Sequence, residues 1–130
     1  MISRLIPALL TLPLVSGTTA DAKTILVTPN VIGTDKYITC TVTNLDTKAV
    51  KVVVDLYNSS ATPLSTIGDT CNSSLLGSGQ TCYTTVNSTI GITSNAFCRF
   101  EVSSAKVKAS LQLRDPDRGT TLLVVPAAKP

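Results

Sequence analysis

The chain has 130 residues, of which 43% are hydrophobic and 15% are charged, and its 11 Lys or Arg against 8 Asp or Glu give a formal net charge of +3. This small excess is spread along the chain, whereas nucleic-acid binding requires clustered cations, so we expect no nucleic-acid partner. The chain contains no His, which excludes Ser-His and Cys-His catalysis and leads us to expect neither a metal site nor another cofactor.

The first 22 residues have the pattern of a secretory signal peptide. A short start with the cation Arg4 precedes a mostly apolar run at 5–15, and small and polar residues follow up to Ala20 and Ala22. The run contains two prolines and is much shorter than the roughly 20 residues needed to span a bilayer. We expect cleavage after Ala20 or Ala22, which would leave one domain at 23–130 with no membrane span, in a secreted or periplasmic protein.

Short strands follow one another through the rest of the chain. Alternation of apolar and polar residues with a period of two predicts half-buried strands rather than helices. The predicted inward faces are Ile38, Cys40 and Val42 in 36–44; Val50, Val52, Val54 and Leu56 in 49–58; Cys82, Thr84 and Val86 in 81–87; Ala96, Cys98, Phe100 and Val102 in 95–102; and Val107, Ala109, Leu111 and Leu113 in 106–114. The last two runs are joined by a short polar link, so 95–114 is predicted to be a hairpin.

The number and spacing of these runs predict the fold class. Seven or eight strands, with turn signals every 8 to 12 residues, indicate an all-β, antiparallel, immunoglobulin-like β-sandwich. A closed barrel is the alternative. The connections differ in length, with long loops before and after 81–87, which favours the crossings of a sandwich over an up-and-down barrel.

All four cysteines lie after the predicted signal peptide, and an even number there predicts disulfides rather than a metal site. Cys40 and Cys98 lie on inward faces in mid-strand, so a bridge between them would clamp the core strands. Cys71 and Cys82 flank a glycine-containing loop that a second bridge could close. Of the three pairings that four cysteines allow, these positions favour Cys40 with Cys98 and Cys71 with Cys82.

Parts of the sequence resemble the bacterial Hydin-type immunoglobulin-like modules. The resemblance lies in CTVTN at 40–44, KVVVDLYN at 51–58 and the C-x10-C segment CNSSLLGSGQTC at 71–82. In that family a strand ends in V-x-N, and a C-x-x-x-x-L-x-x-G-x-x-C segment precedes the next strand. The sequence departs from the family after Cys82, where TTVNSTIG stands in place of an F-x-P ending. The resemblance implies a β-sandwich that serves as a structural or binding module without enzymatic activity.

Three further motifs occur, and the first two have a simpler structural interpretation. Ser103 and Lys106 match S-x-x-K, but in the penicillin-binding acyl-transferases that motif opens a helix and works with partner motifs that are missing here. Asp115 and Asp117 resemble the start of a calcium loop, but the downstream Glu is absent and turn chemistry explains both residues. Glycosylation sequons begin at Asn58, Asn72 and Asn87.

Two outward features are candidates for binding. Tyr37, Val53, Tyr57 and Phe97 fall on the polar faces of predicted strands, where they either form an exposed apolar patch or are covered by loops. The second candidate is the loop made of Leu75, Leu76, Gly77, Ser78, Gly79 and Gln80. We therefore expect a non-catalytic binding or structural module that recognises a protein or a cell-surface polymer. The alternatives are a disulfide-stabilised inhibitor of a protease or hydrolase that presents this loop and, least favoured, a carboxylate-based hydrolase.

Overall fold

The computed structural model describes residues 23–72, 75–87 and 93–130, and this part of the chain forms nine strands and no helix. The predicted signal peptide at 1–22 lies outside it. The strands are β1 (Thr24–Val27), β2 (Val31–Thr34), β3 (Tyr37–Asn44), β4 (Val52–Tyr57), β5 (Gly68–Asp69), β6 (Thr81–Asn87), β7 (Thr93–Val102), β8 (Val107–Arg114) and β9 (Thr121–Pro126). All strand pairings are antiparallel, which confirms the predicted all-β, antiparallel class.

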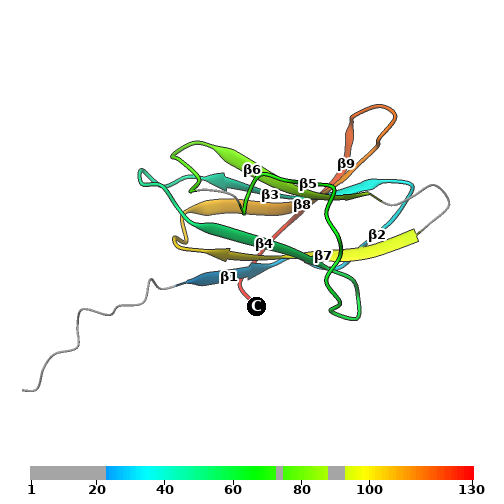
Figure 1. Cartoon of the computed structure of the whole chain (residues 1–130), viewed down its shortest axis with the longest axis horizontal. Coiled ribbons are helices and arrows are strands. Elements are labelled where there is room, and N and C mark those ends of the chain that lie inside the picture. The colour runs from blue at the N-terminus through cyan, green and yellow to red at the C-terminus, as the bar shows by residue number, and fades with distance from the viewer. Residues whose placement is uncertain (1–22, 73–74, 88–92) are drawn as a thin grey trace, which may run out of the picture.

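The strands form two sheets that lie as two layers in Figure 1. In the four-stranded sheet, β7 is central: β4 pairs with one side of it, and β1 and β2 pair with successive halves of its length on the other. The five-stranded sheet has the order β5-β6-β3-β8-β9. The C-terminal tail leaves β9 and pairs with β1 of the other sheet through a bridge between Val27 and Ala128, which closes one side of the sandwich.

The core lies between the two sheets and consists of the predicted inward faces. Phe100 is fully buried in β7, and Leu111 is fully buried in β8. The other residues predicted to face inward are also buried, except Val107 and Leu113, which are partly buried at the ends of β8. A period of two therefore identifies the core faces, because each strand packs one face against the opposite sheet. It does not assign every outward position, since Thr39 and Ser110 on the alternate faces are also buried.

Two details of the predicted topology are wrong. The described residues contain nine strands rather than seven or eight, because the segment after β1, whose Gly33 and Asp35 indicate a turn, forms the separate strand β2. The predicted hairpin at 95–114 does not exist, since β7 and β8 belong to different sheets. The link at 103–106 therefore crosses between the layers, and Ser103 donates its backbone N–H to the Lys51 carbonyl.

The two disulfides have the predicted pairing. Cys40 of β3 is bonded to Cys98 of β7, so this bridge joins the central strand of one sheet to the central strand of the other inside the core. Cys71 is bonded to Cys82 at the start of β6, which ties the segment after β5 to the five-stranded sheet. No free cysteine is left in the described residues.

Candidate functional site

The predicted aromatic surface is brought together only in part. Tyr57 and Phe97 are cross-strand partners on β4 and β7, and their rings stack with centroids 5.5 Å apart. Val53 lies on the same outward face of β4. Tyr37 lies on β3 of the other sheet, so it is not part of this surface. The structure thus gives the outer face of the four-stranded sheet a small aromatic pair, half-buried by its neighbours.

The predicted binding loop at 75–80 is held to the domain at several points. Leu76 is buried in the core and exchanges two backbone hydrogen bonds with Val50. Ser78 donates its hydroxyl to the Asp46 carbonyl at 2.7 Å, and Gly77 donates its N–H to the Gln80 side chain at 2.8 Å. Leu75 is the prominent exposed side chain of the loop, with 62% of its surface accessible.

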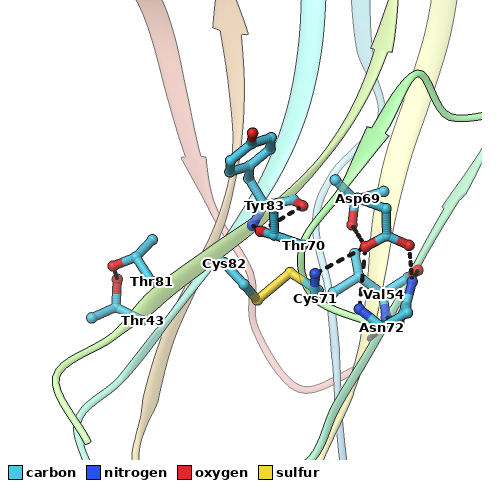
Figure 2. Close-up of a disulfide and its surroundings, with 10 residues drawn as sticks. Thr43, Val54, Asp69, Thr70, Cys71, Asn72, Thr81, Cys82 and Tyr83 are labelled. Atoms are coloured by element: carbon cyan, nitrogen blue, oxygen red, sulfur yellow. Dashed lines mark hydrogen bonds between the residues drawn. A yellow bond between two sulfur atoms is a disulfide. The ribbon is translucent and has the colours of Figure 1, made fainter. Parts of the chain in front are cut away.

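The Cys71–Cys82 bridge lies beside a cluster of polar groups around Asp69 (Figure 2). Asp69 Oδ1 accepts hydrogen bonds from the backbone N–H groups of Cys71 and Asn72 and from the Thr84 hydroxyl. The Asn72 amide in turn donates to the Val54 carbonyl and accepts the Val54 N–H. Asn72 therefore acts like a strand partner for the free edge of β4, which gives this sequon residue a structural role.

The hydrogen bonds that Asp69 accepts lower the pKa of its carboxyl group. Burial would raise the pKa of the Asp69 carboxyl, but the bonds from the Asn72 side chain, the Asn72 and Cys71 backbone and the Thr84 hydroxyl outweigh burial, so the pKa is lowered from 3.8. A carboxyl whose folded pKa lies below its unfolded pKa contributes stability above the unfolded pKa and loses it as the pH falls through the folded pKa.

We predict that Asp69 contributes to acid denaturation. The free energy of unfolding should fall as the pH is lowered below about 4, and Asp69→Asn should make that fall shallower, because the variant has no carboxylate to protonate. Urea titrations between pH 2 and 7 measure the slope. An Asp69→Asn slope equal to that of the wild type would refute the prediction.

A larger feature lies on the outer face of the five-stranded sheet. A groove with a volume of about 810 Å³ runs over β6, β3 and β8. Gly68 of β5 and the adjacent Ile67 bound one side, and Val124 of β9 with the turn at 115–119 bounds the other. The groove thus lies on the side of this sheet that faces away from the core.

The strand register places the floor residues in rows across three strands. One row runs from Lys108 through Thr43 to Thr81, the next from Ser110 through Thr41 to Tyr83, and the third from Gln112 through Thr39 to Thr85. Each row contains one hydroxyl pair. The pairs are Thr43 with Thr81 at 2.7 Å (Figure 2), Thr41 with Ser110 at 2.9 Å and Thr39 with Thr85 at 3.1 Å.

The three hydroxyl pairs allow the floor both to donate and to accept hydrogen bonds. Each pair uses one hydroxyl hydrogen, which leaves a second hydrogen and further lone pairs. Thr39 and Ser110 are buried, so the hydroxyls that a ligand can reach are those of Thr41, Thr43, Thr81 and Thr85. The three pairs also fix the rotamers of their side chains, which lowers the entropy that a ligand would otherwise have to overcome. A floor of this kind matches a ligand that carries many hydroxyl groups.

Aromatic and apolar side chains stand around this polar floor. Tyr83 is 47% exposed, and Figure 2 shows its ring on the side of β6 opposite the Cys82 sulfur. Tyr37, Ile67 and Val124 also line the groove. Aromatic rings offer large rigid surfaces at a low entropic cost, so Tyr83 is the main contact that we expect for an apolar ligand face.

The groove was not predicted as a site, although part of its signal is visible in the sequence. Thr39, Thr41 and Thr43 alternate along 36–44, and Tyr83 and Thr85 face outward in 81–87. Such residues are also typical of any solvated strand face. Only the register of β3 with β6 and β8 shows that they form one surface.

The other sequence motifs have structural roles in the described residues. The Ser103 hydroxyl accepts the Lys51 N–H, and Ser104 donates to Asp46 and accepts the Lys106 N–H, so S-x-x-K forms a turn. Asp115 accepts the Asp117 N–H in the turn before β9. No group of three or more His, Cys, Asp or Glu side chains in the part described could hold a metal ion.

Comparison with known proteins adds no relative to this picture. No protein-family model, curated protein or solved structure matches the chain. Within 23–72, 75–87 and 93–130, no helix is long and apolar enough to cross a membrane.

Proposed function

We propose that this protein is a secreted or periplasmic, non-catalytic module that binds a cell-surface polymer in the groove on the outer face of its five-stranded sheet. The observation that carries the proposal is the groove itself, in which three hydroxyl pairs form the floor and Tyr83 stands beside them. Polysaccharides present hydroxyl groups and apolar ring faces, and this floor and ring complement both.

A binding role without catalysis fits the chemistry of the groove. Hydrolysis of a glycosidic bond ordinarily uses two carboxyl groups that flank the bond. Asp115 is the one carboxylate among the described residues that line the groove, and it accepts a hydrogen bond within its own turn. The cysteines are used in disulfides. The two-sheet architecture is also compatible with the immunoglobulin-like module that the sequence resembles, for which binding is the implied role.

Replacing Tyr83 with Ser tests the proposal. We expect Tyr83→Ser to bind cell-surface polysaccharide about tenfold more weakly than the wild type, because an aromatic contact contributes up to about 1.5 kcal/mol. Affinity electrophoresis in gels containing polysaccharide from the host envelope measures the loss. Tyr57→Ser makes the same chemical change on the opposite face and should bind like the wild type. Loss of binding in Tyr57→Ser but not in Tyr83→Ser would overturn the choice of the groove.

An inhibitor of a protease or hydrolase is the second candidate. The observation that favours it is the rigid loop at 75–80, whose backbone is anchored while Leu75 remains exposed. Preorganised loops bind with a smaller loss of entropy. Replacing Leu75 with Ser should abolish inhibition if the loop has this role, and it should leave polymer binding by the groove unchanged.

A further inference from the structure

Two cations stand at opposite ends of the groove floor. Lys108 and Arg114 both lie on β8, and both line the groove and are exposed. They are six residues apart and therefore on the same face of the strand, at a distance of about 20 Å along it. Ser110 and Gln112 lie between them on that face.

Neither cation forms an ion pair with an acid of the described residues. Among the described residues, no carboxylate oxygen lies within 4.0 Å of the Lys108 ammonium or the Arg114 guanidinium. Arg114 donates one hydrogen bond to the Gly119 carbonyl at 3.2 Å, which holds its side chain near the β8–β9 turn and leaves further donors unused. Asp115 lies at the Arg114 end, so the groove as a whole keeps a net positive charge.

We propose that the ligand of the groove is an acidic polysaccharide whose carboxylates pair with Lys108 at one end and with Arg114 at the other. This inference rests on the proposed function of the groove and names its ligand class. Between the two charged ends, the hydroxyl pairs bond the sugar hydroxyls and Tyr83 packs against a ring face. The planar guanidinium of Arg114 suits bidentate pairing with a carboxylate.

Other anionic polymers fit the groove less well. Duplex nucleic acid carries a charge about every 1.7 Å of its axis, and proteins that bind it neutralise several phosphates with clustered cations. Two cations separated by the length of the floor do not match that density. They fit a uronic-acid polymer better, because it carries one carboxylate per sugar unit, a lower charge density than that of a duplex, and presents hydroxyl groups between its carboxylates to the polar residues between the two cations.

The spacing also predicts a dependence on ligand length. A single acidic sugar reaches one of the two cations, whereas an oligosaccharide that spans the floor contacts both. Affinity should therefore rise with chain length until the oligosaccharide reaches from Lys108 to Arg114, and further units should add little. If only one cation were contacted, lengthening would add hydroxyl and ring contacts alone, and the rise would be the same for acidic and esterified oligosaccharides.

A matched pair of polymers tests the inference on the whole protein. Polygalacturonate and its fully methyl-esterified form have the same backbone, and only the first carries charge. In calcium-free buffer of low ionic strength, the wild type should bind polygalacturonate about fivefold to tenfold more tightly, since each exposed ion pair contributes modestly. The double variant Lys108→Gln with Arg114→Gln should lose this preference and still bind the esterified form. Lys51→Gln, a change of the same type outside the groove, should retain the preference.

The outcomes separate this inference from the proposed function. Equal binding of both polymers by the wild type, or a preference that survives in the double variant, would overturn the acidic ligand. If binding to the esterified form and to envelope polysaccharide still depended on Tyr83, the groove would remain a polymer site. If neither polygalacturonate nor its esterified form bound, the acidic polysaccharide would be rejected as the ligand. If envelope polysaccharide also failed to bind, the proposed function as a polymer-binding module would be rejected as well.

Discussion

Replacing both Cys40 and Cys98 with Ala is expected to lower the free energy of unfolding by about 4 kcal/mol, the value that the loop-entropy relation assigns to a bridge across 58 residues. Domains of this size are stable by about 5 to 15 kcal/mol, so the loss removes a large part of the total. Both sulfurs lie in fully buried residues at the centre of the two sheets. Their removal therefore also costs packing that a surface bridge would not provide.

Urea unfolding followed by circular dichroism at 25 °C measures this loss. Replacing Cys71 and Cys82 with Ala is the matched control, and its shorter separation of 11 residues predicts a smaller loss of about 3 kcal/mol. The order of the two variants is the sharper test, because it does not depend on the absolute size of either effect. A control pair that costs more than the Cys40–Cys98 pair would contradict the prediction.

The inward faces could be predicted because alternation is a local signal. Cys98 and Phe100 are buried for the same reason that Arg99 and Glu101 are not: successive side chains of a strand point to opposite faces. The favoured disulfide pairing rested on this alternation, which places Cys40 and Cys98 inward in mid-strand, and on the loop that Cys71 and Cys82 flank. No information about strand order was needed for either prediction.

Strand partners, in contrast, depend on contacts far apart in the chain. The runs that became β7 and β8 have the polarity of a hairpin, and the short link at 103–106 would permit one. In the structure, β7 has β4 on one side and β1 and β2 on the other, so no edge is left for β8. β8 instead pairs with β3, where Ser110 meets Thr41. Local patterns cannot show which edges are already occupied.

The candidate groove could not be predicted from the sequence either, because it too depends on which strands pair. Its rows combine residues from β3, β6 and β8, and only the register brings Tyr83 next to Thr41 or places Lys108 and Arg114 at the two ends. The aromatic pair of Tyr57 and Phe97 was easier to predict, because both residues are large, apolar and outward on their own strands. Tyr37 shared those properties but belongs to the other sheet.

Asn44 is the polar residue whose loss should affect stability most. It is fully buried at the end of β3, where its amide donates to the Lys48 carbonyl at 2.8 Å and to the Leu76 carbonyl at 3.0 Å. Its Oδ1 accepts the Asp46 N–H at 2.8 Å. The side chain thus joins the turn after β3 to the anchored loop at 75–80.

Replacing Asn44 with Ala should lower the free energy of unfolding by about 3 kcal/mol, at about 1 kcal/mol for each of its three side-chain hydrogen bonds. Urea unfolding at pH 7 measures the loss. Asn58→Ala provides the control, because the Asn58 side chain accepts two backbone hydrogen bonds in an exposed turn. Its loss should be smaller, since water can replace Asn58 but cannot reach Asn44. Equal losses would show that Asn44 has no special role.

The variant Asn44→Asp separates hydrogen bonding from packing. It keeps the shape and the acceptor for Asp46 but places a carboxylate oxygen against the carbonyls of Lys48 and Leu76. Burial and this repulsion disfavour the charged form, so the pKa of the new carboxyl should be raised. A group with a raised carboxyl pKa destabilises the fold above that pKa, and the deficit shrinks as the pH falls towards its unfolded value of about 3.9. The loss in free energy of unfolding of Asn44→Asp relative to the wild type should therefore decrease at low pH, because the protonated acid can again donate a hydrogen bond to one of the two carbonyls. The loss in Asn44→Ala should stay constant, since alanine has no such group.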